Sequence, residues 1–433
     1  MNRTKAFLFA SALIHQLWAD PDQNPSQQLW DPDSAVHYAI THNLELQAAW
    51  LQIERAAGLA EQGSLWSNPR LTAQVSDGEL LSGSGERSFL VQLEQEFPLA
   101  GRLSKLREVG RIDVELARAE WMLQAWKMVH EVREHVLDLY RLYRESAALD
   151  SQRAVVTQVI DQLNGYVQKG EIAQTAVWAY QRQLGALSLE INSLFSSIEE
   201  AEHELGLLLG LPPEDKVSID PTALPDPESL FVGANIEAIL DIRPETRIAR
   251  LAQTRSAARL VALHSATWDS VTLRVFLERD RSEDVPVGFE NETFAGVGIS
   301  INLPFQDPQR GALRAERAEK RAAQLKEAAV EQVIRHEWSH AGHASENEEK
   351  AWLIVQETLI PELDQQIATA QTLLARAELQ PTELFDLQIE RAGLKREAEI
   401  ARAEWLASLN HLRFLSGGDL PKIQSIISTN SEL

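Results

Sequence analysis

The chain of 433 residues contains no cysteine, so it forms no disulfide bond, carries no thiolate chemistry and offers no cysteine to a lipid anchor. It is also poor in basic residues, since 41 Lys and Arg stand against 64 Asp and Glu and the net charge is -23. A surface of that sign repels phosphate backbones, which excludes nucleic-acid binding. Long hydrophobic runs are missing too. After residue 19 no stretch approaches the roughly 20 apolar residues of a membrane-spanning helix, so a membrane role must be carried by strands.

The residues that are present suffice for sizeable cores, with 44% apolar and 24% charged residues. The chain begins with Arg3 and Lys5, an apolar run from Ala6 to Ile14 and a small residue at Ala19. This order predicts a cleavable signal peptide over residues 1–19, and an ordinary amphipathic terminus is the alternative. Cleavage after Ala19 would remove two positive charges and take the net charge from -23 to -25.

The rest of the sequence is an internal duplication, with a first structural repeat over residues 20–220 and a second over residues 221–433. The matching segments are Asn43–Trp50 with Arg243–Arg250, Leu93–Pro98 with Ser300–Pro304, Lys169–Thr175 with Arg376–Thr382, and Gly210 with Gly417. A proline-rich connector, Leu211–Pro227, joins the repeats. Each repeat is therefore predicted to contain the same helices, strand pair and long helical hairpin.

Very long helices are predicted after Pro98 and after Pro304. Apolar residues recur every three or four positions between Pro98 and Gly170, so this element could reach about 100 Å at 1.5 Å per residue. The returning helix of each repeat alternates steps of three and four residues, which specifies antiparallel coiled-coil packing. Its apolar positions are Leu184, Leu187, Ile191, Leu194, Ile198, Ala201, Leu205 and Leu208 in the first repeat, and Leu394, Ala398, Ala401, Trp405, Ser408, Leu412 and Leu415 in the second.

Two candidate strands precede each long helix, because apolar and polar residues alternate with a period of two. The predicted strands are residues 71–76, 89–95, 271–278 and 294–303, joined in pairs by polar loops at Asp77–Glu86 and Asp280–Asn291. Such strands are typical of transmembrane barrels, and soluble hairpins packed on helices fit the same pattern. Four strands cannot close a barrel, and lipid tolerates no open sheet edge. Three copies would supply twelve strands and twelve long helices, so a homotrimer is predicted.

In this arrangement the sequence resembles the TolC family of outer-membrane efflux channels, and within it the heavy-metal cation efflux (CzcC-like) branch. The resemblance rests on Leu65–Leu71, Arg243-Pro244-Glu245, the prolines Pro98 and Pro304, Gln309–Ala312 and the two hairpin tips. It implies a mainly α fold with a small β part, in which antiparallel coiled-coil helices form an α-barrel across the periplasm. Four strands per chain would contribute to a trimeric 12-stranded β-barrel in outer-membrane lipid. The implied partners are a periplasmic adaptor (membrane fusion) protein and an inner-membrane pump of the resistance-nodulation-division type.

The resemblance also implies that the hairpin tips dock the adaptor. The matching positions are Gly170, Glu171, Ile172 and Thr175 in the first repeat, and Ala377, Glu378, Leu379 and Thr382 in the second. Ala377 stands where glycine is usual and should resist a left-handed backbone, so the second turn is expected to differ from the first. Acidic residues commonly ring the closed tip of the family. Glu383 keeps that charge as a candidate pore gate and Ala176 lacks it, while an ordinary solvated helix face is the alternative for Glu383.

A zinc-hydrolase pattern, H-E-x-x-H, occurs at His336-Glu337-Trp338-Ser339-His340, with Glu357 as a conceivable third ligand. It lies inside a long coiled-coil helix without a substrate-holding strand. The first repeat carries His130-Glu131 at the matching place but has Glu134 instead of the second histidine. We therefore interpret these residues as a helix-surface feature and expect no catalytic residue, no cofactor and no metal site. A zinc-dependent peptidase, a helix surface that contacts metal weakly, and a soluble periplasmic coiled-coil scaffold remain alternatives.

Overall fold

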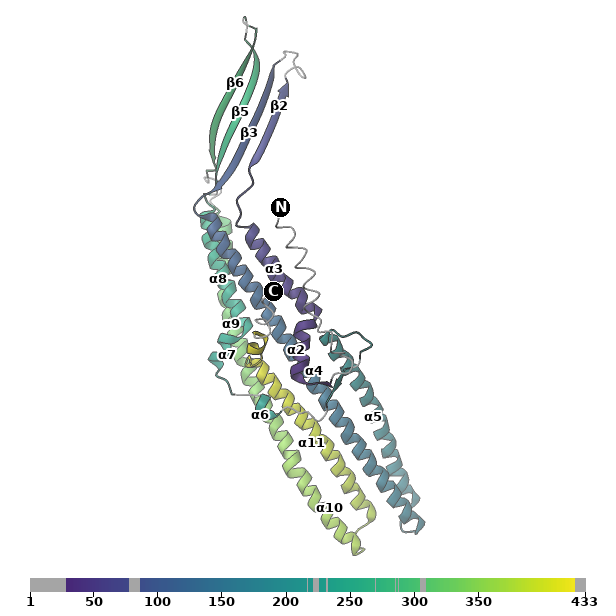
Figure 1. The fold of residues 1–433 in the computed structure, drawn as a ribbon. Helices are drawn as coiled ribbons and strands as arrows, with labels where there is room; N and C mark the ends of the chain where they lie inside the picture. Colours follow the sequence, from purple (N-terminus) through teal and green to yellow (C-terminus); the bar gives the residue numbers. More distant parts are fainter. Residues whose placement is uncertain are drawn as a thin grey trace. The chain divides into compact units, whose positions relative to one another are not determined.

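The structure, a computed structural model, describes residues 29–77, 86–215, 217–220, 226–230, 233–268, 270–284, 286, 288–303 and 309–424 (Figure 1). The predicted signal peptide and Pro304 lie outside these residues. The chain forms two compact units. The sheet unit consists of Trp50–Trp121 and Pro244–Val330. The hairpin unit consists of the described residues up to Ala49, of Met122–Arg243, and of the described residues from Glu331 onwards, so both units draw on both repeats.

Helices dominate the chain, as the apolar spacing predicts. The first repeat contributes α2 (Pro32–His42), α3 (Leu44–Gln62), α4 (Arg102–Gln168) and α5 (Gln174–Leu209). The connector and the second repeat contribute α6 (Pro227–Leu230), α7 (Ile236–Ile242), α8 (Pro244–Ser265), α9 (Arg310–Leu353), the π-helical turn η3 (Ile354–Leu359), α10 (Ile360–Ala375) and α11 (Pro381–Leu415). Helix α4 alone has 67 residues, which confirms the long element predicted after Pro98. Among the described residues, no helix is long and apolar enough to span a membrane.

The long helix of the second repeat is interrupted by a π-helical turn, whereas α4 in the first repeat is α-helical throughout. Pro361 follows the π-helical turn η3 and has no N–H to offer the carbonyl of Glu357. A local wide turn is a common way of accommodating such a lost bond. Both return helices end as expected, because Gly210 and Gly417 each adopt a φ of 75° just after α5 and α11.

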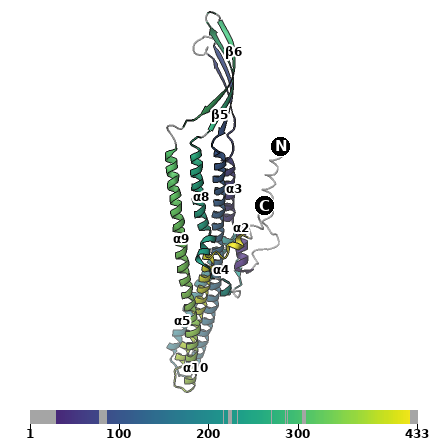
Figure 2. The same ribbon diagram turned by 90° about the vertical axis from the view of Figure 1, so that its left-hand side faces the viewer.

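The sheet unit holds one four-stranded antiparallel sheet in the order β2-β3-β5-β6 (Figure 1). Its strands are β2 (Arg70–Asp77), β3 (Arg87–Pro98), β5 (Ser270–Asp284) and β6 (Gly288–Ile301). The pairing of β3 with β5 joins the strand pairs of the two repeats. Figure 2 shows α8 and the first part of α9 side by side in the same unit, where Arg250 Nε lies 3.4 Å from Glu327 Oε1.

The predicted loop at Asp280–Asn291 is wrong in its bounds. Backbone pairing continues without a gap from Val271↔Ile301 to Asp284↔Gly288, so the loop shrinks to the few residues between the two strands. The apolar alternation stops near residue 279, but ladder hydrogen bonds use only backbone groups and do not require apolar side chains. The prediction from side-chain pattern therefore ended β5 too early and began β6 too late.

The hairpin unit is built around helices α4, α5 and α11. A buried cluster joins Leu149, Val156, Val159, Ile160 and Leu163 of α4, Val177, Tyr180, Leu187 and Ile191 of α5, and Phe385 and Ile389 of α11. The seam predicted for α5 is confirmed, because Leu187, Ile191 and Ile198 are buried there. In α11 the prediction is only partly right. Leu406 and Leu409 are more buried than the expected Trp405 and Ser408, since α11 packs on two faces.

The first described residues of the hairpin unit are tied to the connector. Strand β1 (Leu29–Trp30) pairs in parallel with β4 (Ser218–Ile219), and Trp30 is fully buried. Asp31 then caps α2, because its Oδ1 accepts hydrogen bonds from the backbone N–H groups of Asp33 at 2.8 Å and Ser34 at 3.0 Å. Each of these strands has two residues, too few to show the alternation from which a strand could be predicted.

Candidate functional site

The four-stranded sheet has one apolar and one polar face. The register places Leu71, Leu93, Val275 and Val297 in one row across all four strands. Their side chains lie open to the surroundings, with 70% of Leu71 and 73% of Val297 exposed. One residue further along, Thr72, Gln92, Phe276 and Gly296 form a row on the opposite face. A broad exposed apolar surface of this kind indicates contact with lipid or protein rather than water.

The polar face is closely fitted in two places. Gly296 lies under the ring of Phe276, and a Cβ added at this glycine would come within 2.6 Å of that ring. Glu94 pairs with Arg70 on one side and with Arg274 on the other, so opposite charges stand next to each other across three strands. These contacts give the polar face an ordered surface of mixed charge.

Both edges of this sheet are open. Within the residues that the structure describes, β2 pairs only with β3 and β6 pairs only with β5. The unpaired N–H and C=O groups of two edge strands, of 8 and 14 residues, favour pairing with another chain. Both edge strands are therefore available to pair with neighbouring strands.

The two hairpin tips have the same backbone geometry, which makes the expectation of a different second turn wrong. Gly170 has a φ of 77° and Ala377 a φ of 56°. The N–H of Glu171 donates to the carbonyl of Tyr166, and the N–H of Glu378 donates to that of Leu373, both at 3.0 Å. The shared hydrogen bonds hold Ala377 in a left-handed conformation that costs it about 1 kcal/mol.

The structure assigns different environments to the predicted tip residues. Ile172 and Leu379 are partly buried, and Ile172 packs against the cluster of α4, α5 and α11. Thr382 is also partly buried, whereas Gly170, Glu171, Thr175, Ala377, Glu378 and Glu383 are exposed. An open groove of about 680 Å³ lies between α10 and α11, and Glu362, Leu379, Glu383 and Asp386 are among the residues that line it. Glu383 thus faces solvent beside two other acidic residues.

The side chains of the H-E-x-x-H pattern do not form a metal centre within the described residues. His336, Glu337 and His340 are exposed on α9, and Glu337 Oε2 accepts a hydrogen bond from Arg243 Nη1 at 3.3 Å. Glu357, considered as a third ligand, lies in the exposed part of η3.

A different set of residues comes within metal-ligand distance in the described part of the chain, namely His130, Glu134 and His411. In the sequence, His130 and Glu134 stand opposite the H-E-x-x-H pattern of the second repeat, and nothing there predicts that His411 joins them. The only available signal was the spacing of four between His130 and Glu134 on one helix, since His411 lies far away in sequence. Burial and then the charge of His130 lower the pKa of His411, so its imidazole is neutral at pH 7.

Comparison with known proteins identifies the fold. No protein-family model matches the chain, and no curated sequence is similar enough to count as a relative. Solved structures do match. The outer-membrane channel OprN superposes with a TM-score of 0.75 at 18% identity and covers 90% of each chain. CusC, described for its transmembrane channel formation, superposes with a TM-score of 0.71 at 16% identity over 92% of this chain and 95% of its own. The chain has the TolC-like fold.

A third structure with this TolC-like fold is the outer-membrane channel CmeC of Campylobacter jejuni. It has a TM-score of 0.71 and 13% identity over 95% of this chain and 94% of its own. The mainly α architecture with a small β part is thereby confirmed, and the compared structures are described as channels. Identities below 20% establish the fold and leave activity to be argued from the residues.

Proposed function

We propose that this chain is one subunit of a homotrimeric outer-membrane channel that conducts substrates passively through a tripartite efflux system. The main support for this proposal is the four-stranded sheet. Its apolar face is exposed, its polar face is ordered and both edges are open. Three copies would pair β2 of one chain with β6 of the next, which satisfies every edge and closes twelve strands into a barrel. The apolar faces would then meet lipid and the polar faces would line the pore.

The hairpin tips are proposed as the docking surface for a periplasmic adaptor that is itself bound to an inner-membrane pump. Glu171 and Glu378 are exposed beside turns with the same backbone hydrogen bonds, so one chain presents two similar acidic tips. The corresponding turn residues Gly170, Ile172, Thr175, Ala377, Leu379 and Thr382 complete the proposed docking set. Three copies of Glu383 would form the acidic gate.

The proposed cargo is heavy-metal cations. The net charge of -23 supports this assignment, because acidic pore walls raise the local concentration of cations. The similarity of the sequence pattern to the metal-efflux branch supports it as well. Organic compounds are the competing cargo, and energy would come from the pump in either case.

Membrane fractionation tests the channel. The protein should be recovered with outer membranes and, after extraction in detergent, should run as a trimer by sedimentation or light scattering. A monomer in the soluble fraction would instead indicate a periplasmic scaffold. A Glu337→Gln variant should conduct like the wild type, whereas a zinc peptidase would lose its activity.

Growth of a deletion strain tests the cargo. Loss of the channel should sensitise cells to zinc, cobalt, cadmium or copper, and plasmid-borne wild type should restore growth. If the metals leave growth unchanged while organic toxicants become lethal, the metal assignment fails and the channel assignment stands.

A further inference from the structure

Three potential metal ligands converge between α4 and α11 in the hairpin unit. His130 and Glu134 lie one turn apart on α4, and Nε2 of His130 is 3.1 Å from Oε1 of Glu134. Nδ1 of His411, on α11, is 3.4 Å from the same Nε2. The three ligand atoms all lie within 4.8 Å of one another.

These spacings suit a metal ion as well as hydrogen bonds. Ligand atoms held about 2.1 Å from a tetrahedral ion stand about 3.4 Å apart, close to the 3.1 Å and 3.4 Å found here. Without an ion, one proton on Nε2 of His130 has to serve both Oε1 of Glu134 and Nδ1 of His411, because an acceptor stands on either side of it. A cation satisfies all three lone pairs at once.

His130 is held in place by its surroundings, whereas Glu134 is free to adjust. The ring of Phe414 is stacked on His130, with centroids 4.0 Å apart and planes 9° apart, and it stacks on Trp126 at 4.0 Å as well. His130 itself is only 11% exposed, whereas half of the Glu134 side chain is exposed. Glu134 can therefore close on an ion that arrives from solvent. Nδ1 of His130 is buried and has no partner among the described residues, which leaves it able to carry the ring proton when Nε2 binds a metal.

We propose that His130, Glu134 and His411 bind one divalent first-row transition-metal ion per chain, with solvent in the remaining coordination position. Two imidazoles and one carboxylate favour Zn²⁺, Co²⁺, Ni²⁺ or Cu²⁺ over Mg²⁺ and Ca²⁺, which prefer oxygen ligands. The site joins a helix of the first repeat to a helix of the second. A bound ion therefore cross-links α4 and α11, and it stabilises the hairpin unit by mass action. This site is independent of the exported cargo.

Metal titration of the purified, full-length protein in detergent tests the site. After chelation and dialysis, the wild type should bind one Co²⁺ per chain, with the visible spectrum of a four- or five-coordinate ion, and Zn²⁺ should displace it. Glu134→Gln and His411→Gln should each weaken binding by more than the roughly 10- to 100-fold that loss of an outer-shell partner costs. The double variant His336→Gln and His340→Gln is the matched control, because it removes two exposed histidines outside the cluster and should bind like the wild type.

Thermal unfolding is a second measurement, which distinguishes a variant that has lost a metal ligand from one that no longer folds. Zn²⁺ should raise the thermal unfolding midpoint of the wild type and of the control, and it should leave the midpoint of Glu134→Gln unchanged, because this variant lacks a ligand. Glu134 is exposed, so its replacement preserves packing and the variant should still fold. The proposal is overturned if the wild type binds no ion. It is also overturned if Glu134→Gln and His411→Gln bind as tightly as the wild type, or if the control loses the ion instead.

Discussion

Tyr180 of α5 donates a hydrogen bond from its phenolic oxygen to Oδ1 of Asp386 on α11, 2.6 Å away. The contact joins the helical hairpins of the two repeats one to two turns from their tips. Burial, followed by the hydrogen bond to Asp386, raises the pKa of Tyr180, so the phenol stays protonated and keeps donating at all physiological pH values. The hairpins of one chain are thus held together where the proposed gate residue Glu383 lies.

Tyr180→Phe should loosen this part of the channel. The variant keeps the buried ring but removes a hydrogen bond to a charged acceptor, worth about 1.5–3 kcal/mol. We expect a higher open probability or conductance in planar lipid bilayers. Tyr166→Phe is the matched control, because the Tyr166 ring packs edge-on against Phe385 at 6.4 Å in the same cluster. Equal conductance of Tyr180→Phe, Tyr166→Phe and the wild type would show that the contact does not restrain the gate.

The periodicity of apolar residues predicted those features that depend on which face of a single helix or strand is buried. The three- and four-residue steps of α5 place Leu187, Ile191 and Ile198 in the core because one helix face alone meets its neighbours. Alternation located the four strands for the same reason. The helical periodicity was only partly right in α11, where Trp405 stacks on Trp352 but the adjacent Leu406 is more buried, so burial extends beyond the predicted row of residues.

Features that depend on distant or backbone partners could not be predicted in the same way. The turn at Ala377 follows the hydrogen-bonding geometry of its neighbours rather than its own preference, which a residue-by-residue argument does not include. His411 meets His130 only because α11 packs on α4. The regular spacing of side chains contains no information about either relationship.

The tip turns predict opposite effects of two small substitutions. Ala377→Gly should stabilise the protein by about 0.5–1 kcal/mol, because glycine adopts a positive φ without the steric cost that alanine bears. Gly170→Ala should destabilise it by about 1 kcal/mol for the same reason. Nothing lies within 4 Å of a Cβ added at Gly170, so the change acts through backbone strain alone. Thermal unfolding in detergent would measure both shifts, and shifts of the same sign would contradict this explanation.

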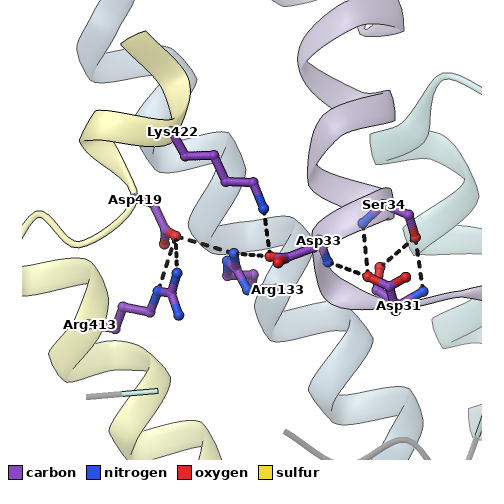
Figure 3. Close-up of polar contacts among 7 residues, drawn as sticks. All are labelled: Asp31, Asp33, Ser34, Arg133, Arg413, Asp419 and Lys422. Atoms are coloured by element: carbon purple, nitrogen blue, oxygen red, sulfur yellow. Dashed lines mark hydrogen bonds and ion pairs between the residues drawn. The ribbon is translucent and has the colours of Figure 1, made fainter. Parts of the chain in front are cut away.

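Arg133 is the centre of a charged network in the hairpin unit (Figure 3). Its Nη2 lies 2.6 Å from Asp33 and 3.2 Å from the buried Asp419, while only 4% of the Arg133 side chain is exposed. Arg133→Met should cost about 3 kcal/mol, because it leaves Asp419 with Arg413 as its main cation. Asp33→Asn should lower the free energy of unfolding by about 0.5–1 kcal/mol, since Asp33 is largely exposed and Arg133 keeps its ion pair with Asp419. Denaturant titration should give this order, and a larger loss for Asp33→Asn would contradict it.

Asp33 also predicts a specific sensitivity to acid. Burial alone would raise the pKa of Asp33, but hydrogen bonds and charges from Lys422 and Arg133 outweigh it and hold the pKa below the ordinary value. The stabilisation is therefore complete above the unfolded pKa of about 3.9 and is lost as pH falls through the lower folded value. The difference in stability between wild type and Asp33→Asn should be constant from pH 7 to about pH 5 and should shrink below about pH 4. A difference that grows in acid would rule out this role.

The two faces of β3 provide the sharpest test of the proposed barrel. Leu93 lies between Leu71 and Val275 on the apolar face, and its neighbour Gln92 lies between Thr72 and Phe276 on the polar face. Leu93→Arg should cost about 2–4 kcal/mol in lipid, because it places a charge against hydrocarbon. Gln92→Arg should be tolerated, because its side chain would face the pore beside Glu94, to which Gln92 already donates at 3.1 Å. Urea titration of trimers folded into lipid vesicles would compare the two. Similar losses for both variants would mean that the faces do not separate lipid from water, and the barrel would have to be abandoned.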